Sequence, residues 1–423
     1  MSSSKFIILF LVTLLLLLYY VYYTNYTLEQ NIPIISSNAL DPLPPLDPWS
    51  AWPPLLSHSI CRPKIYVYPV PENLRIPKSD YFGICYESNY KSEIILWEQL
   101  LSGRIHDHYV TQNPEEADYY YIPFLGSCWL FSQCWQHHHF NFSERCNVDE
   151  RYVLPMMQYV IEAYPYWNRS GGTDHIMVHP MDHSYTYYES NSVFQPAIFL
   201  TTIGDKRQNN FYKIRYSKDI VIPSATSLIH YAGYNPRDYL DEEGYPVNLF
   251  GNRVQRNIFA IFRGGGSDIK PDDAYSQGIR YLLFHGFKDY PGWNIGNSEW
   301  DMFYARQLSR SRFGITPAGW TLDTTRLWEY LAFGVVPVII ADGIIQPFEN
   351  DVDWHGFSVY VRREDAHQLD KILRSITEEE YERKRKRVWE EGARVGLERD
   401  AWHFIARQLC RLKRITRNET LTL

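Results

Sequence analysis

The side chains best placed to do chemistry lie between positions 311 and 354, where a predicted strand ends in Pro-Ala-Gly and a predicted helix begins near Thr324. In a parallel βαβ unit, this loop and the helix N-terminus lie at the carboxyl edge of the sheet, where α/β proteins bind nucleotides. Free N–H groups there favour a phosphate, and a glutamate one turn into the helix could accept hydrogen bonds from ribose hydroxyls. The simpler alternative is a buried crossover in which Arg326 and Glu329 pair with each other. The candidate nucleotide-binding residues are Pro317, Gly319, Thr324, Thr325, Arg326 and Glu329.

A second candidate site follows the predicted strand 258–262. Arg263 stands directly before Gly264 and Gly265, and glycines let a backbone approach a ligand closely. Arg263 is the best phosphate candidate, and Arg280 could face the same pocket. The alternatives are an ordinary flexible turn for the glycines and a surface helix position for Arg280.

Motifs along most of the chain resemble one known family. Between Phe313 and Trp354 the chain reads F-x-x-x-P-x-G, R-L-x-E, G-x-x-P-V-I-I, P-F and D-W, in that order. Further motifs are KIYVYP at 64–69, NPEEADYYYIPF at 113–124, WNRSGGTDH at 167–175 and KDIVIP at 218–223. Together they resemble the exostosin family, glycosyltransferase family 47, from about residue 64 to about residue 376.

The chain departs from that family at three positions. Gly314 and Val335 stand where members usually have cysteine, which suggests a disulfide elsewhere in the family that this chain lacks. Many members also read His-Asp where this chain has Met181-Asp182, so no role that depends on the histidine can be transferred.

The resemblance implies an inverting glycosyltransferase that moves a sugar from a UDP-sugar to a glycan or polysaccharide acceptor in the Golgi lumen. It also implies a GT-B fold, in which two Rossmann-like domains face each other across a cleft. The alternative is a catalytically silent partner subunit of a transferase complex, and oligomers with related transferases are possible in either case.

Such a reaction needs a base for the proton of the acceptor hydroxyl and positive charge for the departing diphosphate. Asp182, beside His179 and His183, is the leading candidate for the base, and Arg263 is the leading catalytic cation. Rival carboxylates are Glu87 and Glu93. The alternative for Asp182 is a structural cap on a helix or turn.

We expect no metal cofactor. The single D-x-D, Asp351-Val352-Asp353, follows Pro-Phe-Glu-Asn and not the apolar strand typical of metal-dependent transferases. Three consecutive histidines, His137–His139, stand among cysteines, but three neighbours cannot all face one ion. UDP-sugar and a glycan are therefore the expected ligands.

The N-terminus predicts a membrane protein. We expect a cytoplasmic tail at 1–5, a transmembrane signal anchor at 6–23 and a proline-rich stem at 24–60. This predicts a single-pass type II membrane protein with its catalytic domain in the lumen, and the resemblance implies the Golgi membrane. Sequons occur at Asn25, Asn141, Asn168 and Asn418, and the position of Asn168 inside a motif favours a buried, unmodified side chain.

Six cysteines in an oxidising lumen are expected to pair. The nearest guesses are Cys61 with Cys85 and two of the set Cys128, Cys134 and Cys146. A formal net charge of −7 argues against a nucleic-acid partner. The basic run Arg383–Arg387 follows acidic residues at helical spacing, which predicts a solvated helix face.

The elements that must position these residues alternate between strand and helix patterns. Such alternation predicts an α/β fold with parallel sheets covered on both faces. We expect an acceptor-side domain at 61–245, a nucleotide-sugar domain at 246–395, and a C-terminal helix and tail at 396–423.

Overall fold

The computed structural model describes residues 61–76, 89–135, 145–207, 214–215, 217–225, 234–266, 270, 275–297, 301–397 and 400–416. The predicted tail, anchor and stem lie outside these residues, as do Glu87, Cys85, His137–His139 and the sequons at Asn25, Asn141 and Asn418. Within the described ranges, no helix is both long enough and apolar enough to cross a membrane.

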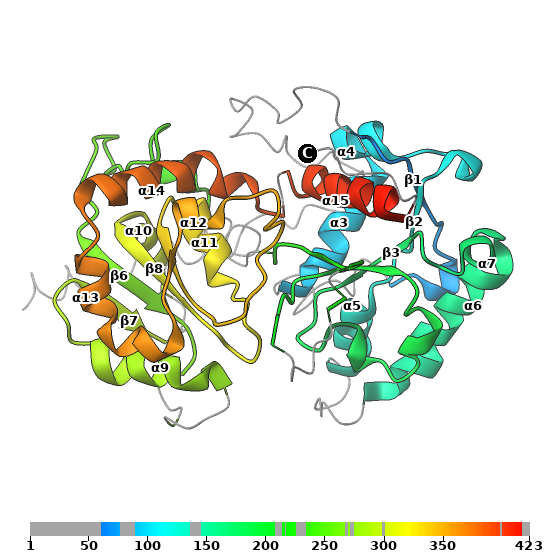
Figure 1. Ribbon diagram of the computed structural model, residues 1–423, viewed down its shortest axis with the longest axis horizontal. Helices are drawn as coiled ribbons and strands as arrows, with labels where there is room; N and C mark the ends of the chain where they lie inside the picture. Colours follow the sequence, from blue (N-terminus) through cyan, green and yellow to red (C-terminus); the bar gives the residue numbers. More distant parts are fainter. Residues whose placement is uncertain are drawn as a thin grey trace, which may run out of the picture. The chain divides into compact units, whose positions relative to one another are not determined.

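The first half of the described chain forms a five-stranded parallel sheet in the order β1-β2-β3-β4-β5 (Figure 1). Its strands follow sequence order, so the sheet has no point at which the strand order reverses. The strands are β1 Ile65–Val67, β2 Tyr119–Tyr121, β3 His175–His179, β4 Ile198–Thr201 and β5 Ile220–Val221. The helices are α3 Ser92–Leu101, α4 Gly103–Tyr109, α5 Gly126–Leu130, α6 Leu154–Ala163 and α7 Tyr166–Ser170.

Both faces of this sheet are buried, which explains its nearly continuous apolar strands. Ile176 of β3 packs in a core that includes Leu96 of α3, whereas Met177, its neighbour in the strand, packs in a second core with Met156 of α6. The alternation of side chains along a strand thus separates the two cores.

The second half also forms a five-stranded parallel sheet, but its order is β10-β9-β8-β6-β7 (Figure 1). The strand order therefore reverses between β6 and β8, where open α/β sheets bind ligands outside the carboxyl ends of their strands. The strands are β6 Ile258–Arg263, β7 Trp293–Gly296, β8 Ser311–Pro317, β9 Val336–Ile340 and β10 Val359–Tyr360. The helices are α9 Ile279–Leu282, α10 Tyr304–Ser309, α11 Arg326–Ala332, α12 Trp354–Phe357, α13 Leu369–Arg374 and α14 Glu378–Glu390.

The predicted βαβ unit is present as β8, α11 and β9. Helix α11 is buried along most of its length and ends at Phe333. Gly334 follows with φ of 63°, a conformation that glycine adopts without strain and that turns the chain into β9. All five residues of β9 are buried, as expected for a central strand.

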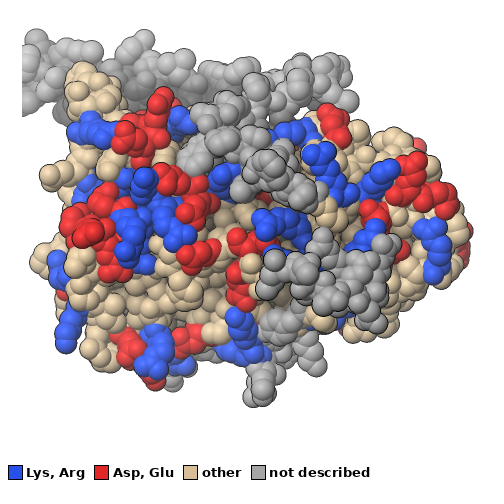
Figure 2. Space-filling model, turned by 45° about the horizontal axis from the view of Figure 1, so that its top comes forward, with Lys and Arg blue, Asp and Glu red and all other residues tan. Residues whose placement is uncertain are grey.

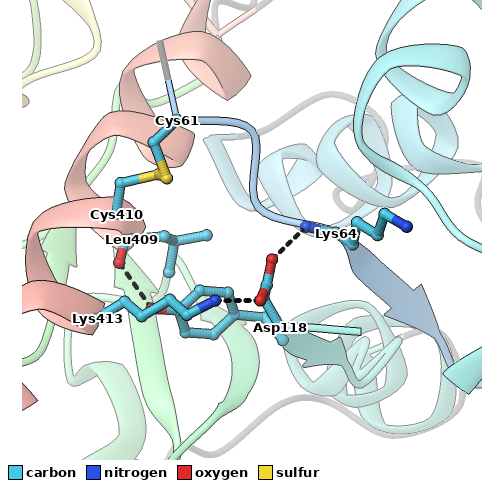
Figure 3. The surroundings of a disulfide bond; sticks show 7 residues. Cys61, Lys64, Asp118, Leu409, Cys410 and Lys413 are labelled. Atoms are coloured by element: carbon cyan, nitrogen blue, oxygen red, sulfur yellow. Dashed lines mark hydrogen bonds and ion pairs between the residues drawn. A yellow bond between two sulfur atoms is a disulfide. The ribbon is translucent and has the colours of Figure 1, made fainter. Parts of the chain in front are cut away.

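The C-terminal helix α15, Ala401–Thr416, packs on the first half of the chain. Trp402 is almost fully buried and its indole N–H donates to the Leu96 carbonyl, while the Tyr119 hydroxyl donates to the Leu409 carbonyl. A disulfide joins Cys410 of this helix to Cys61, just before β1 (Figure 3).

This disulfide corrects the predicted pair Cys61 with Cys85. The bonded cysteines are 349 residues apart, and only the return of α15 to β1 brings them together, so nearness in sequence was no guide. Cys128 and Cys146 are also disulfide-bonded, and none of the described cysteines is free. In the same region Asp118 accepts from the backbone N–H of Lys64 and forms an ion pair with Lys413 of α15 (Figure 3).

Several contacts connect the halves. The loops after β4 and β9 pair through backbone bonds, from Lys206 N–H to the Gly343 carbonyl at 2.7 Å and from Ile345 N–H to the Gly204 carbonyl at 2.9 Å. Gly204 allows this approach, because a Cβ there would stand 2.2 Å from the Ile345 oxygen. Asp351 of the D-x-D makes a further contact, with α15, which is described with the candidate site.

Two surface expectations need correction. Lys384 and Arg385, in the middle of the basic run, are buried: Lys384 donates to the His355 and Ser358 carbonyls, and Arg385 to the Glu243 carbonyl. The face drawn in Figure 2 shows acidic and basic side chains intermixed. Asn168 is exposed, which corrects the expectation of a buried side chain. The neighbouring Tyr166 and Trp167 are the buried residues of this segment, and the Asn168 amide donates to the Ile161 carbonyl at the surface.

Candidate active site

Arg280 of α9 connects the two loops at the point where the strand order reverses. Its guanidinium donates to the Gly265 carbonyl at 2.9 Å, in the loop after β6, and to the Ala318 carbonyl at 3.3 Å, in the loop after β8. Burial lowers the pKa of Arg280, and the positive charge of Arg326 acts in the same direction. The structure thus brings together Arg280, Gly265 and the Pro317–Gly319 loop.

The glycines of these loops leave room for a ligand. A Cβ on Gly265 would meet nothing within 4 Å, so the backbone there is open to close approach. A Cβ on Gly319 would stand 3.3 Å from the Arg280 guanidinium. By contrast, Gly264 sits against the Phe262 ring, at 2.7 Å from the position of a Cβ, so its small size serves packing.

Arg326 and Glu329 form an ion pair in which the glutamate is buried and the arginine is partly exposed. Arg326 donates to both Glu329 oxygens, at 2.8 and 3.0 Å, and the Tyr304 hydroxyl donates to one of them at 2.8 Å. Glu329 is fully buried, and its charge raises the pKa of Arg326. The pairing that the sequence left as an alternative is therefore present. A ribose contact by Glu329 stays a prediction, and it would require the carboxylate to release one of these partners.

Arg263 points across β7 and not along its own loop. Its guanidinium donates to Gln307 at 3.0 Å and lies 3.5 Å from Asp301, both beyond β7. Gly296 of β7 makes room for it, since a Cβ there would overlap the Arg263 side chain. The Arg263 carbonyl accepts a bond from Arg326 at 2.6 Å. The cations beside the open loops are thus Arg280 and Arg326, and a catalytic role for Arg263 stays a prediction.

The start of α11 holds a carboxylate that sequence reasoning missed. Thr325 precedes the helix without a side-chain cap, and Thr324 lines a small cavity with Asp323. Asp323 accepts from the Thr321 hydroxyl at 2.7 Å and from Ser224, after β5 of the first sheet, at 3.3 Å. Burial raises the pKa of Asp323 to about 6, and the charge of Asp182 contributes. An aspartate just before a helix is usually an ordinary cap, so no sequence pattern predicted this placement.

Asp182 lies half-buried after β3, and burial raises its pKa, although the neighbouring His183 opposes the effect. The charges of both aspartates also act on Tyr90, just before α3. Burial raises its pKa first, followed by the charges of Asp182 and Asp323. The structure therefore gathers a predicted base, an unpredicted carboxyl and a phenol at the carboxyl edges of the two sheets.

The other candidates for the base are less accessible. Glu93 is fully buried and accepts from the Ser127 N–H, the Ser127 hydroxyl and the Cys128 N–H, at 2.7 to 3.2 Å. Glu93 therefore holds the start of α5. This corrects its interpretation as a rival base, because its carboxylate is not accessible to an acceptor. His179 is packed among aromatic rings, and burial lowers its pKa to about 3.

An exposed aromatic pair borders the open loops. Trp320, directly after Gly319, is 64% exposed. The ring of Tyr275 meets it at a centroid distance of 5.2 Å in an edge-on arrangement. Sequence reasoning named no single ring for stacking, but exposure beside the Arg280 loops now distinguishes this one.

The aspartates of the D-x-D are held by arginines. Asp351 is fully buried as a side chain between Arg407 and Arg411 of α15, at 2.8 and 2.6 Å. Asp353 accepts from the N–H of Gly356 in α12 and pairs with Arg387. The first aspartate thus ties the second half to α15. The expectation that no metal takes part stays a prediction.

Two parallel sheets, with glycine loops and buried arginines at a reversal of strand order, define an α/β protein suited to a phosphorylated ligand. Residues 61–376 match the Exostosin GT47 domain, and the chain belongs to this family of glycosyltransferases. The family resemblance found in the sequence is therefore confirmed.

Several curated relatives come from plants. A probable glucuronosyltransferase of Oryza sativa subsp. japonica is 29% identical over 82% of this chain and 80% of its own length. Another rice protein, probable glucuronosyltransferase GUT1, is 30% identical over 76% of this chain and 72% of its own. The probable β-1,4-xylosyltransferase IRX10L of Arabidopsis thaliana is 30% identical over 77% of this chain and 74% of its own.

Proposed function

We propose that this glycosyltransferase takes a sugar from a UDP-sugar, inverts the anomeric centre and extends a glycan or polysaccharide in the Golgi lumen, as a type II membrane protein. The observation that carries the donor assignment is the position of Arg280 between the Gly265 and Ala318 carbonyls, next to Arg326. Two parallel sheets, each with candidate groups at its carboxyl edge, support a GT-B arrangement. The names of the relatives favour sugar transfer and leave glucuronic acid and xylose as the first donors to test.

The leaving diphosphate would lie against the loops after β6 and β8. Arg280 and Arg326 supply two positive charges there, and the accessible backbone at Gly265 supplies room. Charge-assisted bonds of this kind contribute about 1.5–3 kcal/mol each, so two of them stabilise the departing charge substantially without a metal. Trp320 is suited to stack on the base or on a sugar ring.

The acceptor would enter from the first half. A cavity of about 770 Å³ lies at the carboxyl ends of β1 and β2. The partly exposed rings of Tyr66 and Trp97 line it together with the polar side chains of Arg75 and Gln112. Aromatic rings with a few polar groups suit a sugar chain, and Asp182 follows β3 of the same sheet.

The test is release of UDP by the purified full-length protein against a panel of UDP-sugars, with oligosaccharide acceptors and with water alone. We expect release with one donor and a faster rate with its acceptor. The rival proposal, a silent partner subunit, predicts no release with any donor and activity only after co-expression with a related transferase. In that case Arg280→Ala in this chain would leave the activity of the complex unchanged.

A further inference from the structure

Tyr304, the first residue of α10, contacts the ion pair beside the open loops through its buried hydroxyl. We propose that Tyr304 is a positioning residue for the donor diphosphate, because it holds Glu329, and Glu329 in turn holds the guanidinium of Arg326 at the end of β6. The inference rests on the proposed function and adds a residue that lies outside every motif found in the sequence.

The contacts of Tyr304 close into a ring. Its hydroxyl donates to Glu329 at 2.8 Å, and Glu329 accepts from Arg326 at 2.8 and 3.0 Å. Arg326 donates through Nε to the Arg263 carbonyl at 2.6 Å. The Arg263 side chain returns to α10, where it donates to Gln307 at 3.0 Å, about one turn after Tyr304. The ring joins β6, α10 and α11, and it therefore fixes three elements around one guanidinium.

The start of α10 is also held by bonds outside this ring. Asp301 forms a turn in which its carboxylate accepts from the Phe303 N–H at 2.8 Å and its carbonyl accepts from the Tyr304 N–H at 2.9 Å. The carboxylate also accepts from the Gln307 amide at 2.8 Å. Loss of the Tyr304 hydroxyl alone should therefore leave α10 in place, so the hydroxyl is available to orient Glu329.

Two arginines present unbonded corners to the same loop. The guanidinium of Arg326 donates to protein acceptors through Nε and Nη1, and that of Arg280 also uses Nε and Nη1. The Nη2 atom of each makes no hydrogen bond with any described residue, and neither Nη2 is buried. Their carbonyl partners in the loop after β6, Arg263 and Gly265, are two residues apart. Two such corners suit a diphosphate, because the planar fork of arginine matches phosphate oxygens.

Glu329 gives the guanidinium of Arg326 a direction. An arginine that is already held loses little rotamer freedom when a phosphate binds. Without the Tyr304 hydroxyl, the carboxylate of Glu329 can turn, and the Nη2 corner of Arg326 then loses its place at the loop. Tyr304 should therefore affect the affinity for the phosphates of the ligand and leave the affinity for uridine unchanged.

The test is a double-mutant cycle on the Kd of UDP, measured by calorimetric titration of the full-length protein. Tyr304→Phe removes only the hydroxyl and should weaken UDP binding about threefold to tenfold. Arg326→Lys keeps a cation beside Glu329 but has no fork to orient, so in this background Tyr304→Phe should change the Kd less than about twofold. Tyr290→Phe, at a tyrosine that is 44% exposed, is the matched control and should bind UDP as the wild type does.

Uridine, which lacks both phosphates, separates positioning from a general loosening of the fold. Competition with UDP should give the same uridine affinity for Tyr304→Phe and the wild type. An equal loss for uridine and UDP overturns the proposal. So does a Tyr304→Phe effect that is as large in the Arg326→Lys background as in the wild type.

Turnover gives a second readout with the donor that the panel selects. The diphosphate gains charge as its bond to the sugar breaks, so Tyr304→Phe should lower kcat by a larger factor than it raises KM. A higher KM with an unchanged kcat overturns the role in the departure of the diphosphate.

Failure of the proposed function is a separate observation. If UDP binds and the cycle shows coupling, but no UDP-sugar releases UDP, the proposed transfer fails and Tyr304 still positions Arg326. If UDP does not bind to the wild type, the positioning role is overturned.

Discussion

The guanidinium of Arg326 lies 2.8 Å from the carboxylate of Glu329, and no part of Glu329 reaches the surface. Replacing Glu329 by Ala removes the partner of the buried Tyr304 hydroxyl and leaves the partly exposed Arg326 with only the Arg263 carbonyl. We expect a loss of about 3–5 kcal/mol in the free energy of unfolding, the usual cost of breaking a buried pair. Chemical denaturation checks this, with the exposed Glu364→Ala as a matched control. A stable variant that binds UDP more weakly would instead support the ribose contact.

Arg280→Ala should weaken the binding of UDP by about tenfold to a hundredfold, because a charge-assisted bond is lost and the Gly265 and Ala318 loops are released. Calorimetric titration of UDP measures the effect. Arg362→Ala removes an arginine whose side chain is 70% exposed and serves as the control. Equal affinities for the two variants would remove Arg280 from the donor site.

Arg263 offers a direct comparison between sequence and structure. If Arg263 is a catalytic cation, its replacement by Ala should lower turnover by about 10²–10³. Its contacts with Gln307 and Asp301 predict a different result, a change of less than about tenfold with a lower Tm, because Gln307 and Asp301 each lose one partner. Steady-state rates and thermal melting of Arg263→Ala distinguish the two, and a thousandfold loss of turnover would restore the catalytic role.

Burial raises the pKa of Glu93 to about 8, so its contribution to stability is full below the ordinary pKa of a glutamate and is lost as pH rises through about 8. We expect the Tm of the wild type to fall between about pH 5 and pH 8. The fall should be smaller in Glu93→Gln, whose side chain stays neutral. The exposed Glu115→Gln should follow the wild type. Parallel curves for all three proteins would contradict the assignment.

Transfer should continue in excess EDTA if arginines alone stabilise the diphosphate. The measurement is UDP release before and after chelation, followed by manganese, magnesium or zinc. A rate that chelation abolishes and manganese restores would contradict the metal-free proposal.

The sequence predicted those parts of the fold that rest on local patterns. Apolar strands such as Val336–Ile340 and the glycine after α11 marked the βαβ unit, and ordered motifs identified the family. Sequence patterns do not show which side of a loop a charged residue faces. For this reason the sequence predicts ligand contacts for Arg263 and Glu329, whereas the structure pairs both with protein groups. Asp323 and the Cys61–Cys410 bond depend on contacts between distant segments, which local patterns do not encode.

The bond from Cys61 to Cys410 also sets an order of events during synthesis. Cys61 can pair only with a cysteine that the ribosome adds 349 residues later. Until then the apolar surface that Trp402 and Leu409 will cover stays open. A stop codon before position 400 would therefore damage the earliest-made half of the enzyme, while every residue between Arg280 and Glu329 had already been made.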